Sequence, residues 1–256
     1  MPSWDPNQYL KFADERTRPA VELLARVPLE NPKRIVDLGC GPGNSTALLK
    51  KRWPKAEVTG MDRSAEMLAA AREKLPKVKW IQGDIVTWKP DRPFDLIFSN
   101  AALQWLPDHS SLFPRLMEQL DEGGVLALQM PCNQYSPVHQ ILREVAQDAA
   151  WKQDLKAATR AIHVEPPAFY YNALRDVASR IDLWETEYQH VMKSAAAILE
   201  WMRGTALRPY LEALHDEDRS LHFEQMCLAR IEEAYPRRPD GKVLFNFRRL
   251  FLVISR

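Results

Sequence analysis

A glycine-rich loop near residue 40 is the first feature of this sequence that could do chemistry. The segment Asp37-Leu-Gly-Cys-Gly-Pro-Gly43 follows an apolar run and precedes a helical pattern. Glycines at such a junction let a ligand approach the backbone and the amino end of the helix. A dinucleotide-binding loop would need a further glycine at position 44, which is Asn. The loop therefore argues against NAD, although a tight turn without any ligand remains the alternative.

Two further acidic residues follow later apolar runs. Asp62 comes directly after Glu57-Val-Thr-Gly-Met, and Asp84 follows Val78-Lys-Trp-Ile within Gln-Gly-Asp-Ile. The first carboxylate could accept hydrogen bonds from both hydroxyls of a ribose, and the second could meet an adenine amino group. Taken alone, Asp62 could instead be an acidic residue at the N-terminus of a helix, and Asp84 could be an ordinary turn residue. Three acidic residues at the carboxyl ends of successive strands would line one crevice, so we expect a functional site there.

Alternating strand and helix patterns would position these residues. Short apolar runs are separated by helical patterns of about ten residues up to residue 130. This alternation predicts a doubly wound α/β fold with a mostly parallel sheet and helices on both faces. The expected strands are 34–38, 57–61, 78–81, 94–99 and 125–129, and the expected helices are 44–53, 64–74 and 110–120.

The second half of the chain has a different pattern. It is mainly helical, with two further apolar runs that would complete a seven-stranded sheet. The helices between these runs would form a cap over the carboxyl ends of the parallel strands, where ligands bind. The expected helical patterns are 138–161, 168–179 and 195–235, and the expected strands are 183–191 and 244–255.

These patterns divide the chain into four expected segments. Residues 1–30 would form an N-terminal helical segment covering the site, and residues 31–135 the α/β core that binds the cofactor. Residues 136–180 would form a helical cap that contributes to substrate binding. Residues 181–256 would supply the last two strands, with a helical insertion at about 195–235.

Composition argues against several classes of function. Lys and Arg number 35 against 34 Asp and Glu, so no broad positive field would hold nucleic acid or an anionic membrane. The three cysteines form no CxxC pair, and the six histidines form no pair at ligand spacing, so we expect neither a disulfide framework nor a metal site. No apolar run is long enough to cross a bilayer. We therefore expect a soluble cytoplasmic protein.

The motifs around the crevice resemble those of the class I S-adenosylmethionine-dependent methyltransferases. The resemblance covers residues 30–130 and rests on Val36-Asp-Leu-Gly-Cys-Gly-Pro-Gly-Asn-Ser, Gly60-Met-Asp-Arg-Ser, Gly83-Asp-Ile and Ser99-Asn-Ala-Ala-Leu-Gln-Trp-Leu. It implies S-adenosylmethionine as cofactor and S-adenosylhomocysteine as product. The implied cofactor-binding residues are Asp37, Gly39 and Gly41 at the methionine end with Cys40 between them, Asp62 at the ribose with Arg63 beside it, Asp84 and Ile85 at the adenine, and Asn100 and Ala101 near the sulfonium.

Segments outside this region resemble the trans-aconitate 2-methyltransferases over the whole chain. They are Trp4-Asp-Pro-Asn-Gln-Tyr, Arg16-Thr-Arg-Pro-Ala, Trp201-Met-Arg-Gly-Thr-Ala-Leu-Arg-Pro-Tyr and Phe245-Asn-Phe-Arg-Arg-Leu-Phe. The resemblance implies methylation of one carboxylate of trans-aconitate or a similar small polycarboxylate. Guanidinium groups would bind the carboxylates that do not react. The implied substrate-binding residues are Trp105, Arg208 as first choice, Arg203, Arg16 and Tyr9.

A carboxylate acceptor would need no catalytic base. Its pKa lies near ~4, so the nucleophile is already ionised at neutral pH and catalysis would depend on positioning. Two alternatives stay open: methylation of a malonyl group on a carrier protein or of a quinone precursor, and a non-catalytic module that only binds S-adenosylmethionine. The expected state is a monomer or a weak homodimer.

Overall fold

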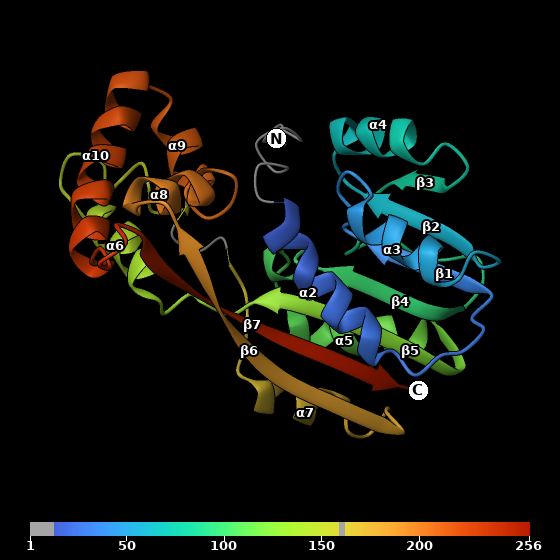
Figure 1. Cartoon of the computed structure of the whole chain (residues 1–256). Helices are drawn as coiled ribbons and strands as arrows, with labels where there is room; N and C mark the ends of the chain where they lie inside the picture. The colour runs from blue at the N-terminus through green and yellow to red at the C-terminus, as the bar shows by residue number, and fades with distance from the viewer. Residues whose placement is uncertain (1–12, 159–161) are drawn as a thin grey trace.

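The centre of the molecule is a seven-stranded sheet (Figure 1). A computed structural model describes residues 13–158 and 162–256, with the backbone alone for residues 13–16. The strand order is β3-β2-β1-β4-β5-β7-β6; β7 runs antiparallel to both neighbours and all other pairs are parallel. The predicted doubly wound, mostly parallel α/β class is confirmed. The strands are β1 (Arg34–Leu38), β2 (Glu57–Asp62), β3 (Lys79–Gln82), β4 (Phe94–Asn100), β5 (Leu120–Pro131), β6 (Arg180–Met192) and β7 (Val243–Ser255).

Helices connect the strands, and several of them begin at a residue whose side chain caps the first turn. In the helix after β2, for example, the Ser64 hydroxyl accepts a hydrogen bond from the Met67 amide at 3.1 Å, which satisfies one of the free amides of the first turn. The helices are α2 (Ala13–Arg26), α3 (Asn44–Arg52), α4 (Ala65–Lys74), α5 (His109–Glu118), α6 (Pro137–Val145), α7 (Pro167–Leu174), α8 (Ala195–Arg203), α9 (Arg208–Leu214) and α10 (Glu217–Ala234).

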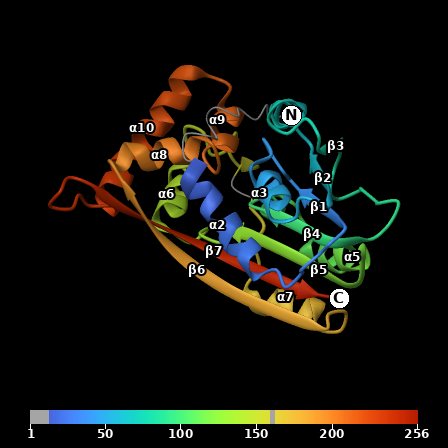
Figure 2. The same ribbon diagram turned by 45° about the vertical axis from the view of Figure 1, so that its right-hand side comes forward.

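Helices cover both faces of the sheet (Figures 1 and 2). On one face α2 and α3 bury Leu23 and Leu49 against Ile35 and Phe98 of the central strands. On the other face α5 and α7 form a separate apolar cluster, in which Phe113 and Tyr170 are fully buried. Because both faces are covered, the central strands are nearly continuous apolar runs, which explains why they were visible in the sequence.

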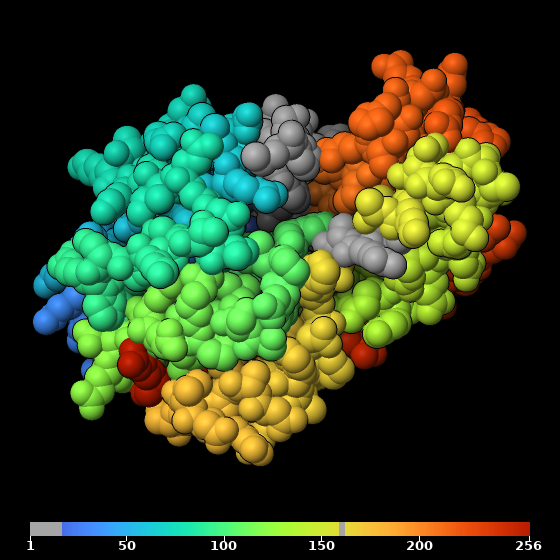
Figure 3. Space-filling model, turned by 180° about the vertical axis from the view of Figure 1, so that it is seen from behind, coloured from blue at the N-terminus to red at the C-terminus, as the bar shows by residue number. Residues whose placement is uncertain are grey.

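A helical cap with its own apolar core lies at one end of the sheet (Figure 1) and forms the orange and yellow-green lobe of Figure 3. It consists of α6, α8, α9 and α10, packed around Trp201 and Phe223. The long strands β6 and β7 support it, because β7 pairs with β5 only over residues 249–255 but with β6 over its whole length. The part of this two-stranded ribbon that extends beyond β5 carries the cap, since α8 follows β6 and β7 follows α10.

Two helical segments differ from the sequence patterns. The helix expected over 138–161 ends at Val145, and turns follow it to residue 158. The Val145 carbonyl accepts hydrogen bonds from the Asp148 amide and from the Trp151 indole nitrogen, the latter at 2.7 Å, so it is not available to continue the helix. Within the segment expected to form a cap at 136–180, α6 packs in the cap, whereas α7 packs against α5 and β6 on the face of the sheet.

Candidate active site

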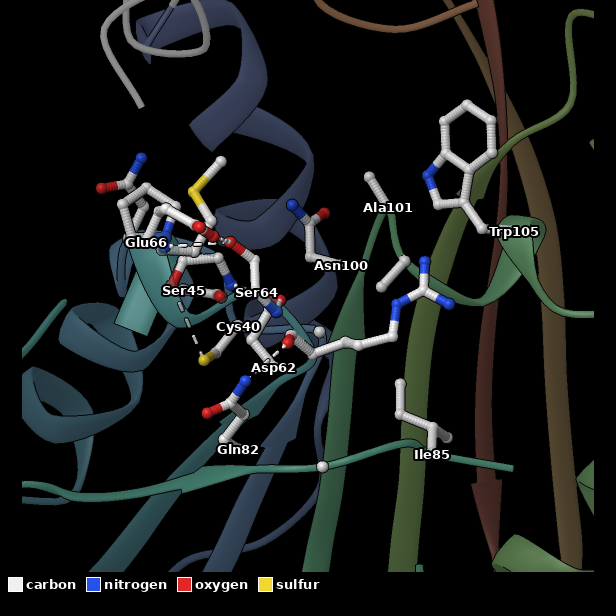
Figure 4. Close-up of a pocket in the computed structure, with 18 of the residues that line it drawn as sticks. Cys40, Ser45, Asp62, Ser64, Glu66, Gln82, Ile85, Asn100, Ala101 and Trp105 are labelled. Atoms are coloured by element: carbon white, nitrogen blue, oxygen red, sulfur yellow. Dashed lines mark hydrogen bonds between the residues drawn. The ribbon is translucent and has the colours of Figure 1, made fainter. Parts of the chain in front are cut away.

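A pocket of about 340 Å³ lies at the carboxyl ends of the parallel strands (Figure 4). This volume is in the range of small-molecule sites. In Figure 4, Cys40, Asp62 and Ser64 lie together on one side, while Ala101 and Trp105 lie on the other. Nine of the ten residues expected to bind the cofactor, together with Trp105, are on its wall: Gly39, Cys40, Gly41, Asp62, Arg63, Asp84, Ile85, Asn100, Ala101 and Trp105.

The glycine loop is held by β2 and has one side open to the pocket. The amides of Gly39 and Cys40 both donate to the Met61 carbonyl, at 2.8 and 3.0 Å. Gly39 has φ +69°, and a Cβ there would lie 2.2 Å from the Ala102 Cβ. Gly41 has φ +52°, but a Cβ there would meet nothing within 4 Å. Packing therefore requires glycine at 39, whereas glycine at 41 keeps space free for a ligand.

Asp62 links the glycine loop to the start of α4. Its Oδ2 accepts from the Gly41 amide and its Oδ1 from the Ser64 amide, both at 2.9 Å. A carboxylate can accept about four hydrogen bonds, so each oxygen can still accept one more from a ligand hydroxyl. Asp62 is thus both a structural clamp for the loop and a candidate acceptor for the ribose.

Asp37, the remaining predicted cofactor residue, is completely buried beneath the loop and is not on the described pocket wall. Its Oδ2 accepts hydrogen bonds from the hydroxyls of Ser45, at 2.7 Å, and Thr46, at 2.6 Å. Its Oδ1 has no partner among the described residues. Burial raises the Asp37 pKa to about 6, against the effect of the two hydroxyls and with a smaller contribution from the charge of Asp62. The free oxygen beneath the loop is therefore a candidate acceptor for a cationic group.

The end of β4 has a strained backbone. Ala101 has φ +56°, a conformation that costs a residue with a Cβ about 1 kcal/mol or more. It is held there because its amide donates to the Gln129 carbonyl at 2.9 Å and its carbonyl accepts from the Gln104 amide group at 2.8 Å. Next to it, Asn100 Oδ1 is buried and has no hydrogen-bond partner in the described part of the chain. Strain and an unpaired acceptor at one strand end are typical of a ligand site.

The described wall of the pocket is acidic overall. Among the side chains that the structure describes, Asp62, Glu66 and Asp84 line it with one guanidinium, that of Arg63. Asp84 Oδ1 accepts from the Val86 amide at 2.9 Å, which fixes the turn after β3. Sequence reasoning missed Glu66 as a lining residue, although its place in the first turn of a helix next to the crevice was a usable signal. A net negative wall suits a ligand that carries a sulfonium and an ammonium group.

Two of the three substrate arginines expected from sequence, Arg203 and Arg208, are not on this wall. Arg203 donates to both carboxylate oxygens of Glu224, at 2.6 and 2.8 Å, and also to Glu200. Arg208 forms an ion pair with Glu212 at 2.7 Å. Arg16 lies in α2, but its side chain is outside the described part, and Tyr9 lies outside the described residues altogether. A substrate-binding role of these four residues remains a prediction.

No described residues form a cluster that suggests a metal centre. Among residues 13–158 and 162–256, no group of three or more His, Cys, Asp or Glu side chains could hold an ion. Cys40 lines the pocket, but burial, followed by the charges of Asp37 and Asp62, raises the pKa of its thiol far above neutrality. A thiol in that environment is a poor nucleophile. None of the described helices has the length and apolar character of a membrane span.

The fold and the pocket define a class I S-adenosylmethionine-dependent methyltransferase, and comparisons with known proteins agree. A family model described as a methyltransferase domain matches residues 35–124. The YcgJ protein of Bacillus subtilis has a similar fold, with a TM-score of 0.60 at 13% identity, over 93% of this chain and 98% of its own. A geranyl diphosphate C-methyltransferase of Streptomyces coelicolor, solved with S-adenosylhomocysteine, has a TM-score of 0.56 at 15% identity, over 97% and 83%.

Relatives with much higher identity identify the family within that class. Trans-aconitate 2-methyltransferase of Azoarcus sp. (strain BH72) is 53% identical over the full length of both chains. The enzymes of the same name from Rhizobium rhizogenes and Rhodopseudomonas palustris (strain HaA2) are 50% and 49% identical, over 98% and 99% of each chain. The chain belongs to the trans-aconitate 2-methyltransferase family.

Proposed function

We propose that this protein transfers the methyl group of S-adenosylmethionine to one carboxylate of trans-aconitate and forms its monomethyl ester. The observation that carries the proposal is the extent of the similarity: 53% identity spans the cap as well as the cofactor-binding half. A similar cofactor loop alone would leave the acceptor open, whereas the cap would be the part that adjoins the acceptor. This similarity favours trans-aconitate over the alternative acceptors and over a non-catalytic binding module.

The residues around the pocket suit the cofactor. Asp62 has acceptor capacity for the two ribose hydroxyls, and Asp84 with Ile85 lines the end suited to the adenine. Gly39, Cys40 and Gly41 would border the methionine end, with Arg63 beside the ribose. The unpaired oxygens of Asp37 and Asn100 would accept hydrogen bonds from the ammonium group of S-adenosylmethionine, directly or through water. Asn100 and Ala101 would flank the sulfonium.

The protein's contribution to catalysis would be positioning and charge. When bound, S-adenosylmethionine supplies a methyl group that a carboxylate oxygen can attack directly; the sulfur keeps the electron pair of the broken bond. An ionised carboxylate has no proton to lose, so no catalytic residue is proposed. Trp105 lies on the pocket wall beyond Ala101 and would exclude water from the reacting atoms.

The wider setting is also part of the proposal. The partner is a small polycarboxylate, and nucleic acid and membrane are not expected as partners because the net charge is only +1. We propose a cytoplasmic location and a monomer or weak homodimer. Sedimentation at micromolar concentration tests the last point.

Methyl transfer from labelled S-adenosylmethionine tests the main proposal. The protein is incubated with trans-aconitate, citrate, a malonyl thioester and crotonate, and the products are analysed for base-labile methyl esters. We expect the highest kcat/KM with trans-aconitate and unchanged turnover in EDTA, because an ionised carboxylate needs no metal to become nucleophilic. Preference for the malonyl thioester, or no labelled product from any acid, would refute the proposed acceptor.

A further inference from the structure

A second cavity lies beside the cofactor pocket, and Trp105 lines both. Its volume is about 60 Å³, against about 340 Å³ for the cofactor pocket. It can therefore hold a few non-hydrogen atoms, the size of one arm of a small acid. The other described residues on its wall come mostly from α6, the segments that flank it and α9: Gln134, His139, Leu142, Arg143, Ala158, Ile162, Ala206 and Tyr210.

The described wall of this cavity carries positive charge without a carboxylate to balance it. Arg143 is its only charged side chain among the described lining residues. Within residues 13–158 and 162–256, no ion pair or side-chain hydrogen bond of Arg143 is found. A half-buried guanidinium offers five N–H donors in a planar fork, which matches the two oxygens of a carboxylate. The cavity thus has the donor that an anionic arm requires.

A second unsatisfied group faces the same space. His139 is only 6% exposed, and its Nδ1 is buried without a hydrogen-bond partner in the described part of the chain. Burial, reinforced by the charge of Arg143, lowers the His139 pKa to about 4, so the ring is neutral at physiological pH. A neutral imidazole has one N–H donor, and leaving a buried polar nitrogen unpaired costs free energy that a bound ligand can recover.

Arg203 of α8 and Arg208 of α9, unlike Arg143, already pair with protein carboxylates. Both oxygens of Glu224 already accept from Arg203, and Glu212 pairs with Arg208. A substrate carboxylate at either of them would compete with a protein carboxylate that already neutralises the guanidinium, so less net affinity would be gained there. No protein carboxylate pairs with Arg143 in the described part of the chain, and Arg143 lies in a cavity that adjoins the cofactor pocket.

We propose that the small cavity is the subsite for a non-reacting carboxylate of the acceptor, and that Arg143 and His139 bind it. This inference rests on the proposed function, since it assumes a polycarboxylate acceptor. Holding one arm here while another carboxylate meets the methyl group beyond Trp105 would restrict the orientations of the acceptor. Selection of a polycarboxylate over a monocarboxylate of similar size would follow from this subsite.

Binding to a complex that cannot react separates this inference from the activity itself. The affinity of trans-aconitate and of crotonate is measured calorimetrically with the protein saturated with S-adenosylhomocysteine. In Arg143→Gln we expect the affinity for trans-aconitate to fall about 10- to 100-fold, the usual loss for a charged hydrogen bond, with crotonate unchanged. Arg143→Lys should lose less, because lysine keeps the charge but lacks the fork.

Matched variants make the result specific. Arg230→Gln removes an exposed arginine of the cap that pairs with Glu144, next to Arg143 in α6, and should bind trans-aconitate as the native protein does. Unchanged affinity for S-adenosylhomocysteine shows that each variant is folded. Native affinity in Arg143→Gln together with a loss in Arg208→Gln would overturn the inference. If the native protein neither binds nor methylates trans-aconitate, the proposed function fails instead.

Discussion

Replacing the buried Asp37 by Asn should change how stability depends on pH. Asp37 is completely buried, and burial raises its pKa from the ordinary value of 3.8 to about 6. A carboxyl group with a raised pKa in the folded state destabilises the fold once it ionises. That cost is absent below the unfolded pKa, grows as the pH rises from about 4 to 6, and is constant above the folded pKa. Asn does not ionise, so the variant should not show it.

The magnitude follows from the two pKa values. At 1.36 kcal/mol per pKa unit, the full cost above pH 7 is about 3 kcal/mol. At pH 4.5 linkage gives about 1 kcal/mol, because the folded protein still holds most of its proton there. The stability of Asp37→Asn relative to the native protein should therefore rise by about 2 kcal/mol between pH 4.5 and pH 8. The difference at a single pH also contains the change in hydrogen bonding to Ser45 and Thr46, so the slope is the informative quantity.

Urea unfolding of both proteins across this pH range measures the slope. All other titrating groups are common to the two proteins and cancel in the difference. Ser45→Ala supplies a control of opposite sign: it removes a hydrogen bond that lowers the Asp37 pKa, so its stability relative to the native protein should fall as the pH rises. A flat difference for Asp37→Asn between pH 4.5 and 8 would refute the idea that Asp37 ionises at a cost in the free protein.

Two predictions concern the glycine loop and its clamp. Asp62→Ala should weaken S-adenosylhomocysteine binding by about 1.5–3 kcal/mol in calorimetry. Asp95→Ala is the control, because Asp95 also accepts hydrogen bonds from two backbone amides, those of Lys33 and Arg34, but does not line the pocket. Equal losses of affinity in both variants would contradict a direct role for Asp62. Gly39→Ala should lose more than about 2 kcal/mol of unfolding free energy, because its Cβ would lie 2.2 Å from the Ala102 Cβ at positive φ. Gly41→Ala is also at positive φ but has nothing within 4 Å, so it should lose less stability than Gly39→Ala and should lose cofactor affinity. A stable, fully binding Gly39→Ala would show that the loop can shift.

The sequence determined the fold class and the position of the glycine loop. Strands such as β1 and β4 are buried on both faces, so they are short apolar runs that propensity alone can identify. Parallel strands with a regular order bring their carboxyl ends to one edge, which is why Asp62 and Asp84 could be predicted to line one crevice although 22 residues separate them. The geometry of each such motif is set by residues that are close together in the sequence.

Helix length and helix packing were harder to predict from the sequence. The periodic pattern of residues 138–161 is compatible with one helix, yet the Trp151 indole donates to the Val145 carbonyl and turns replace the second half. Likewise α7 is apolar enough for a cap or for a sheet face, and its buried Tyr170 packs against Phe113 of α5. The hydrophobic periodicity of a sequence indicates that one face of a helix is buried, but it does not indicate which part of the protein covers that face.

The charges around the proposed acceptor site were decided by tertiary structure. By residue type and helical pattern alone, Arg143, Arg203 and Arg208 are equivalent cations. Only the family resemblance placed Arg208 and Arg203 first, and it did not include Arg143. The fold pairs Arg203 with Glu224, 21 residues away, and Arg208 with Glu212, while it sets Arg143 beside the buried His139 in a cavity next to Trp105. The Arg208–Glu212 pair is one helical turn apart and local, but the Arg203–Glu224 pair and the cavity beside Arg143 join segments distant in the chain. The electrostatic role of a guanidinium depends on which carboxylates lie within a few ångströms of it, so the tertiary fold decides that role wherever the neighbours are distant in the chain.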